Sequence, residues 1–251
     1  MSHRKRTIVV GATSAMAVHC MRLWAERGDT DFVLIGRDAV RLDHVRQDLQ
    51  TRFTPLDVTT LALDLTDPQA VSKTVRHIAQ AGPIDRVLIA HGSLPDQQAC
   101  EQDLGLLHET LMVNGVSPVL FAQAFALPMA MQSHPSVLCV IGSVAGDRGR
   151  KSNAFYGAAK SMVSTCLQGL QHRHAGTPLQ CVLIKPGPTR TPMTQGLDMP
   201  DSRLASVESV SADIVQAMER GQAVRYTPAK WRWIMWMIRN MPAALFNKLN
   251  I

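Results

Sequence analysis

Short runs of apolar residues alternate along this chain with longer stretches in which apolar residues recur every three or four positions. The first pattern is typical of buried strands, and the second is typical of amphipathic helices. The runs predict strands over residues 7–10, 32–35, 60–63, 85–90, 137–141 and 179–184. The longer stretches predict helices over about 14–27, from an N-cap at Asp38, from Asp67-Pro68, over about 104–113 and 115–132, and through Tyr156 to about His174. Residues 92–103 are predicted to form a loop.

This alternation predicts a parallel sheet, because each parallel pair of strands needs a crossover helix that packs on one face of the sheet. Right-handed crossovers predict an α/β fold with a Rossmann-type, doubly wound sheet of about seven strands and helices on both faces. We expect one domain over residues 1–228 and an amphipathic C-terminal tail over 229–251 that is not an independent domain. Functional groups of such sheets gather where the strands end, so those loops are the places to search.

The composition is that of a globular protein with a mild basic bias. Of the 251 residues, 46% are hydrophobic and 18% are charged, and the net charge is +6. The bias fits an anionic ligand or a membrane surface, whereas the lack of a long basic run or an aromatic ladder argues against nucleic acid. Neither a signal peptide nor an apolar run long enough to span a bilayer is apparent.

The cysteines are scattered, and none has the Cys-x-x-Cys spacing of a zinc site. We therefore predict no metal and reduced thiols in a cytoplasmic protein. The residues concerned are Cys20, Cys100, Cys139, Cys166 and Cys181.

Tyr156 and Lys160 are the first candidates for chemistry, because residues four apart lie on one face of a helix. A phenol has a pKa of about 10, and an ammonium beside it favours the phenolate and lowers that pKa. Such a pair can give a proton to a carbonyl oxygen or take one from an alcohol. Taken alone, the same spacing also describes an interface tyrosine and a solvated lysine.

The turn after the first predicted strand is a candidate phosphate site. It opens a helix, whose first backbone N–H groups favour a pyrophosphate. Alanines stand where second and third glycines are usual, so the segment is either a nucleotide loop or only a tight turn. The predicted cofactor residues here are Gly11, Thr13, Ser14, Ala15 and Met16.

The next strand ends supply further candidates for cofactor binding. Arg37 stands where an NAD site often has a carboxylate, and a guanidinium suits the 2′-phosphate of NADP. We therefore favour NADP(H) and keep NAD(H) open. Asp64 and Leu65 are placed near the adenine, and Ala90 and Gly92 would let the backbone pass close to the cofactor. His91 between them is either an acid or base or, more commonly for a loop histidine, a hydrogen-bonded structural group.

With these features in order, the chain resembles the short-chain dehydrogenase/reductase family over about residues 6–227. The resemblance is carried by GATSAMA at the first turn, Asp64, Ala90-His91-Gly92, Asn114, Ser143, Tyr156-x-x-x-Lys160 and Pro186-Gly187. The chain departs from the family where Ala90-His91-Gly92 replaces Asn-Ala-Gly and where two alanines occupy the first turn.

The resemblance implies a role for each motif residue. Tyr156 would be the general acid for hydride transfer to a ketone, and Lys160 would lower its pKa and bind the nicotinamide ribose. Ser143 would polarise the carbonyl, and Asn114 would anchor a water that relays protons to Lys160. The loop after the sixth strand would bind the carboxamide and phosphate through Pro186, Gly187, Thr189 and Thr191. A homodimer or homotetramer is implied as well.

Two stretches of the chain have features that are not part of the general family pattern. The loop between Ser143 and Tyr156 carries Arg148, Arg150 and Lys151, which would suit a phosphorylated substrate or, alternatively, belong to a solvated loop. The C-terminal tail carries Trp231, Trp233 and Trp236 interleaved with basic residues, and a proline at 242 separates two short predicted helices. The tail suits a helix lying in a membrane interface, or a helix packed on a partner subunit.

These stretches also resemble one subgroup, the reductases that act on decaprenylphosphoryl 2-keto-pentose in cell-wall synthesis. That resemblance implies a 2-keto sugar on a polyprenyl phosphate and a peripheral position on the inner face of the cell membrane. The subgroup's cofactor can be NADH, which conflicts with the interpretation of Arg37. The competing predictions are a reductase for a soluble ketone or acyl thioester, and a non-catalytic dinucleotide-binding sensor or scaffold.

Overall fold

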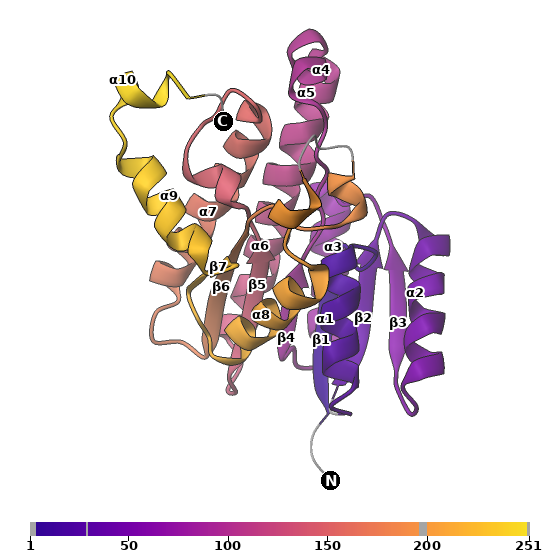
Figure 1. The fold of residues 1–251 in the computed structure, drawn as a ribbon. Helices are drawn as coiled ribbons and strands as arrows, with labels where there is room; N and C mark the ends of the chain where they lie inside the picture. Colours follow the sequence, from indigo (N-terminus) through magenta and orange to yellow (C-terminus); the bar gives the residue numbers. More distant parts are fainter. Residues whose placement is uncertain (1–3, 29, 196–199, 250–251) are drawn as a thin grey trace.

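The computed structural model describes residues 4–28, 30–195 and 200–249. Its centre is a seven-stranded, fully parallel sheet with the strand order β3-β2-β1-β4-β5-β6-β7 (Figure 1). The predicted doubly wound sheet is therefore confirmed, with the order reversing at β1 and β4. The strands are β1 (Lys5–Val10), β2 (Thr30–Gly36), β3 (Val58–Ala62), β4 (Arg86–Ile89), β5 (Ser136–Ile141), β6 (Leu179–Pro186) and β7 (Val224–Thr227).

Ten α-helices among the described residues cover the sheet and extend beyond it. They are α1 (Ala15–Ala25), α2 (Ala39–Arg52), α3 (Pro68–Gln80), α4 (Gln97–Gln102), α5 (Leu104–Leu111), α6 (Ser117–Ala130), α7 (Ala154–Arg173), α8 (Val207–Glu219), α9 (Lys230–Asn240) and α10 (Ala243–Phe246). Shorter helical turns are η1 (Met112–Val116), η2 (Val144–Asp147), η3 (Pro192–Thr194) and η4 (Asp201–Arg203).

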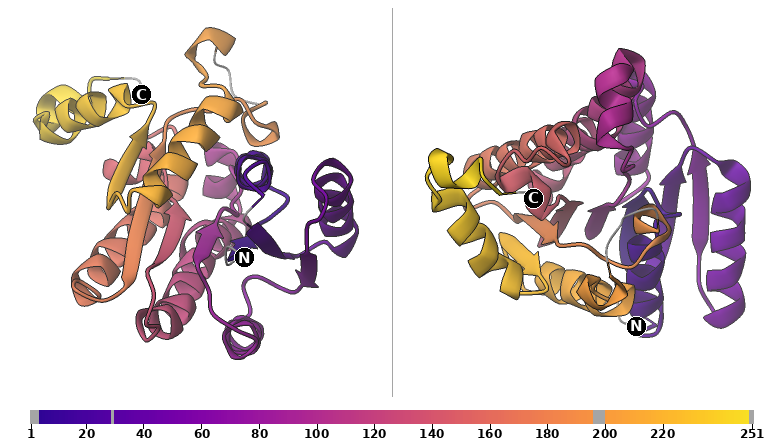
Figure 2. Two further views of the ribbon diagram at one scale, coloured as in Figure 1. Left: turned by 90° about the horizontal axis from the view of Figure 1, so that it is seen from below. Right: turned by 45° about the horizontal axis from the view of Figure 1, so that its top comes forward.

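Helices cover both faces of the sheet (Figure 2), and a separate hydrophobic core lies on each face. Helices α3, α6 and α7 pack on one face, with Phe121 and Phe125 fully buried at its centre. Helices α1, α2 and α8 pack on the other, around the buried Trp24. Strands covered on both faces have almost no polar side, which explains why their sequences are continuous apolar runs.

The predicted helix starts follow the expected capping chemistry. The carboxylate of Asp38 accepts from the backbone N–H of Arg41 at 3.0 Å, and that of Asp67 accepts from Gln69 at 2.8 Å, with Pro68 in the first turn. Both side chains satisfy backbone donors that the helix itself leaves unpaired.

The region after β4 differs from the prediction in two ways. Residues 92–103 are not all loop, because Asp96 caps the short helix α4. The helices expected over 104–113 and 115–132 are one continuous helix, in which the π-helical turn η1 joins α5 to α6. Gly115 does not end the helix. A Cβ atom there would lie 3.2 Å from Cα of Ala159, so this glycine lets α7 approach closely.

By length and composition alone, the stretch Leu104–Ala130 is apolar enough to cross a membrane. The sequence analysis found no uninterrupted apolar run of this length and expected two helices here, over 104–113 and 115–132. Half of its most apolar window is buried inside the protein, and the side chains of Phe121 and Phe125 belong to the core. A core helix of this length passes the same test, so the stretch alone is not enough to indicate a membrane span.

Candidate active site

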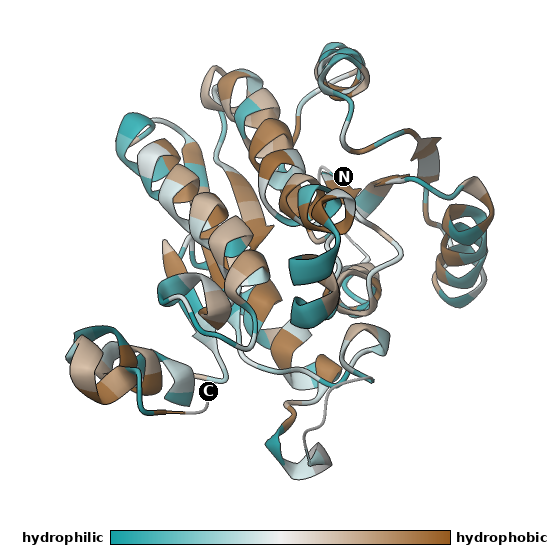
Figure 3. Ribbon diagram, turned by 90° about the horizontal axis from the view of Figure 1, so that it is seen from above, coloured by the Kyte–Doolittle hydropathy of each residue, from teal (hydrophilic) through white to brown (hydrophobic). Residues whose placement is uncertain are grey.

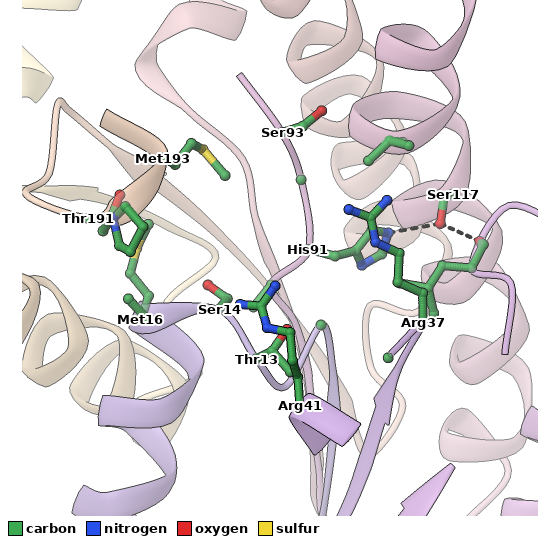
Figure 4. Close-up of a pocket in the computed structure, with 18 of the residues that line it drawn as sticks. Thr13, Ser14, Met16, Arg37, Arg41, His91, Ser93, Ser117, Thr191 and Met193 are labelled. Carbon is green, nitrogen blue, oxygen red and sulfur yellow. Dashed lines mark hydrogen bonds between the residues drawn. The ribbon is translucent and has the colours of Figure 1, made fainter. Parts of the chain in front are cut away.

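A cavity of about 300 Å³ lies at the carboxyl ends of β1, β2 and β4, where the sheet order reverses (Figure 4). Parallel α/β sheets bind ligands at this position. Most of the predicted cofactor residues line it: Gly11, Thr13, Ser14, Ala15, Met16, Arg37, Asp64, Leu65, Ala90, Gly92 and Thr191. The lining also contains residues not predicted as cofactor-binding: Gly36, Arg41, Thr66, His91, Ser93, Glu109, Val113, Ser117, Pro192 and Met193.

The first turn is shaped for a close approach of the backbone. Gly11 has φ +75°, and a Cβ atom there would lie 2.5 Å from the backbone nitrogen of His91. Its own N–H donates to the carbonyl of Ile35 at 2.8 Å, which ties the turn to the neighbouring strand. Ser14 is the N-cap of α1 but makes no side-chain capping bond, so N–H groups of the first helical turn stay available to an anion.

Two guanidinium groups border this cavity. Arg37 follows β2 and Arg41 lies one turn into α2, and both side chains are exposed. The sequence analysis found Arg37 and missed Arg41, which lies in the first turn of the helix that Asp38 caps. Together they offer up to ten N–H donors to a phosphate group.

Asp64 and His91 both line the cavity, and both already have partners within the chain. The Asp64 carboxylate accepts from the backbone and hydroxyl of Thr66, and these hydrogen bonds lower its pKa. His91 Nε2 lies 2.8 Å from the Ser117 hydroxyl, which donates to the Leu65 carbonyl. Burial first, and then the charge of Lys160, lower the pKa of His91 to about 3. His91 is thus a neutral, hydrogen-bonded group. This agrees with the second of the two predictions for this residue, a structural role in the loop.

Tyr156 and Lys160 lie on α7 beside the end of β5. Tyr156 is half-buried, and the neighbouring Ser143 side chain acts to lower its pKa. Lys160 is 3% exposed, donates to the Ile141 carbonyl at 3.2 Å, and has its Nζ 5.7 Å from the centre of the Tyr156 ring. The structure therefore brings Ser143, Tyr156 and Lys160 together at one strand end.

The pKa values in this group differ from the expectation that the ammonium lowers the phenol pKa. Burial raises the pKa of Tyr156 to about 12, which the hydrogen bond to Ser143 only partly offsets. Burial also lowers the pKa of Lys160 to about 8. The correction has a simple cause, since exclusion of water disfavours the charged form of both groups.

Asn114 sits in the π-helical turn and is fully buried. Its amide oxygen accepts from the Ser93 backbone at 2.9 Å, and its Nδ2 donates to the Thr110 carbonyl at 3.0 Å. A Cβ atom on Gly92 would lie 2.8 Å from Asn114 Oδ1 and 3.6 Å from Lys160 Nζ. Gly92 therefore keeps the space between these two polar groups open, on the wall of the cavity.

The loop after β6 contributes only part of its predicted set to the cavity. Thr191 lines it, whereas Thr189 is buried and its hydroxyl donates to the Gly187 carbonyl at 3.0 Å. Pro186 and Gly187 are also buried and do not line the cavity. A Cβ atom on Gly187 would lie 1.9 Å from Nε1 of Trp231, so the tail helix α9 rests directly on this loop.

The three cations between Ser143 and Tyr156 have different surroundings. Arg148 donates to the carbonyls of Ile238 and Met241, the latter at 2.6 Å, and stacks 3.8 Å from the centre of the Phe246 ring. Arg150 is half-buried; burial lowers its pKa, while the charge of Asp147 raises it. Lys151 is exposed. Arg148 is thus engaged with the tail.

A buried ion pair that the sequence analysis missed lies at the base of this loop. Lys185, directly before Pro186, pairs with Asp147, and both side chains are nearly inaccessible. The Tyr226 hydroxyl donates to the second oxygen of Asp147 at 2.8 Å. Burial, the hydrogen bond and the charge of Asp147 raise the pKa of Tyr226 to about 12. The pair ties η2 to β6 and β7, close to the candidate catalytic residues.

A model of the short chain dehydrogenase family matches residues 5–201, and the chain belongs to this family. It is therefore an NAD(P)-dependent oxidoreductase. The sequence is 28% identical over 248 residues to an uncharacterized oxidoreductase of Streptomyces coelicolor, covering 97% of this chain and 95% of the relative.

Solved structures of the family have the same fold. A short-chain dehydrogenase from Burkholderia cenocepacia, in complex with NADP, superposes with a TM-score of 0.81 at 18% identity, covering 100% of this chain and 99% of the other. One from Sphingobium yanoikuyae, in complex with NADPH, gives 0.81 at 23% identity, covering 96% and 97%.

Proposed function

We propose that the chain is an NADPH-dependent carbonyl reductase in which Tyr156 gives a proton to the substrate oxygen. The observation that carries this proposal is that Ser143, Tyr156 and the buried Lys160 come together at the end of β5, with Lys160 close to Gly92 on the cavity wall. A bound nicotinamide would supply the hydride. Ser143 would hold the carbonyl oxygen, and a phenol with its pKa near 12 keeps its proton until the oxygen becomes basic.

Replacing Tyr156 with phenylalanine tests this role. Tyr156→Phe removes the donated proton but keeps the ring, so we expect NADPH binding to persist while turnover of a ketone falls by about 10²–10⁴-fold. NADPH fluorescence on binding and NADPH oxidation with a panel of ketones measure the two effects separately. Wild-type turnover in the variant would refute the mechanism. A wild-type chain that binds NADPH but reduces no ketone would favour the sensor or scaffold.

The preference for NADP(H) rests on Arg37 and Arg41 at the cavity edge, and the family structures with NADP or NADPH bound support it. An Arg37→Gln/Arg41→Gln variant should lose affinity for NADPH by about tenfold or more while affinity for NADH changes little, because only NADPH carries the 2′-phosphate. The matched control is Arg46→Gln, which removes a charge from α2 at a residue outside the cavity lining. Equal losses for both cofactors would contradict the preference.

For the substrate, we propose a 2-keto sugar carried on a polyprenyl phosphate, as the subgroup resemblance implies. Arg150 and Lys151 support an anionic group on the substrate side, since Arg150 is half-buried and its Nε has no hydrogen-bond partner among the described residues. A reductase for a soluble ketone or acyl thioester is the alternative.

Turnover of matched keto sugars, with and without the polyprenyl phosphate, separates these substrates. Arg150→Gln should raise KM for the phosphorylated ketone by about tenfold and leave the neutral ketone unaffected, because only the former presents an anion. Arg173→Gln, which removes a charge from the far end of α7, is the control. Equal effects on both ketones would argue against the anion site, and full activity without any lipid would favour the alternative.

A further inference from the structure

The outer side of the C-terminal tail exposes large apolar side chains. Trp233 is 70% exposed and Trp236 is 63% exposed, and Met237 beside them and Leu245 on α10 are also mostly exposed. We call Trp233, Trp236, Met237 and Leu245 the tail surface. Single exposed apolar side chains also occur elsewhere on the protein, but exposed tryptophans grouped on one helix are unusual, and such groups mark interaction sites.

The tail surface is exposed although helix α9 is packed firmly on the rest of the protein. Met235 on the opposite side of α9 is fully buried, and Trp231 at its start rests on Gly187. Arg148 donates to the carbonyls of Ile238 and Met241 at the end of α9, and its guanidinium stacks on the ring of Phe246. With about 100° between successive residues, Trp233, Trp236 and Met237 then fall within one arc on the side away from these contacts.

Cations border this arc, and acidic residues are absent from the tail. Lys230 and Arg232 flank the tryptophans on either side of the helix, and both are exposed. The segment 229–251 contains Lys230, Arg232, Arg239 and Lys248 and no aspartate or glutamate. An apolar strip with tryptophans and a basic rim is complementary to the headgroup region of an anionic bilayer. A second copy would bring two such basic rims together, which is unfavourable.

We infer that the tail surface docks the protein on an anionic lipid bilayer. The 11 residues of α9 span roughly 16 Å, about half of the hydrocarbon core, so the helix lies in the interface and does not cross it. The tail stands out on one flank of the molecule when it is viewed from the end at which the strands terminate (Figure 3). Its contacts with Gly187 and Arg148 place it beside the loops of the candidate active site.

Co-sedimentation with vesicles tests the docking without substrate or cofactor, so its outcome is independent of the proposed function. The full chain should bind vesicles of phosphatidylcholine mixed with phosphatidylglycerol and bind phosphatidylcholine alone much less. Trp233→Ser/Trp236→Ser should weaken binding by about tenfold or more, because the apolar anchor is lost. Lys230→Gln/Arg232→Gln should remove most of the dependence on phosphatidylglycerol and on salt.

Matched controls change equally exposed residues elsewhere. Leu104 is 76% exposed and Met131 is 79% exposed, so Leu104→Ser/Met131→Ser removes similar apolar surface without touching the tail. Lys73→Gln/Arg76→Gln removes two exposed charges from α3. Circular dichroism of every variant shows whether it is folded. The inference is overturned if the wild type does not sediment with anionic vesicles, if the controls weaken binding equally, or if the tryptophan variant changes only the self-association of the protein.

Discussion

Lys160 is an ammonium enclosed by protein, with one carbonyl as its hydrogen-bond partner among the described residues. Its burial favours the neutral amine and explains the lowered pKa of about 8. The phenol of Tyr156 responds to the same exclusion of water in the opposite direction, because its charged form is the deprotonated one. Spacing along a helix predicted that these two residues share a face, but it contains no information on how much water reaches them.

A stability measurement tests the buried charge. Lys160→Met should raise the free energy of unfolding at pH 7 by about 1–2 kcal/mol, because the cost of burying the ammonium exceeds its single hydrogen bond. The pKa of Lys160 is lowered from 10.5 to about 8 in the folded state, so the wild type carries this cost in full below pH 8 and loses it as the pH rises towards 10.5. The advantage of the variant should therefore shrink over that window in urea unfolding. An advantage that is constant with pH would contradict this assignment.

Among the elements, the tail was predicted as helices but not as part of the site. A tryptophan-rich helix after β7 and a second short helix after Pro242 are both present as α9 and α10. The sequence could not indicate that Arg148 binds the end of α9, because the two are about 90 residues apart and nothing local links them. The same arginine was predicted from its neighbours to bind substrate.

The Arg148 contact has a measurable effect on the tail. Arg148→Ala removes a charged cap from the carboxyl end of α9 and the stacking on Phe246, so amide hydrogen exchange should become faster over residues 230–246. Unfolding should be easier by about 1–2 kcal/mol. Lys151→Ala in the same loop is the control, and Arg148→Lys should restore only part of the protection because it lacks the fork of donors. Unchanged exchange in the alanine variant would show that the tail is held elsewhere.

At the scale of the whole molecule, the sheet was the most predictable part. Each strand buried on both faces is a local apolar run, and the topological rule then places the loops that follow these strands around one cavity. Local patterns do not identify residues that arrive from other elements, such as Arg41, Ser117 and Met193. Nor do they reveal that Asp147 and Lys185 form a buried pair, since each is an ordinary loop or strand-end charge in the sequence.

The close contact of Trp231 with Gly187 makes two distant positions depend on each other in any variant of this protein. The methyl group of an alanine at 187 would overlap the indole ring of Trp231. Such a substitution therefore requires either a smaller side chain at 231 or a displaced tail. Libraries that vary these positions separately should therefore recover glycine at 187, whereas libraries that vary them together should recover new pairs. Redesign of the substrate specificity should treat the loop and the tail as a single unit of selection.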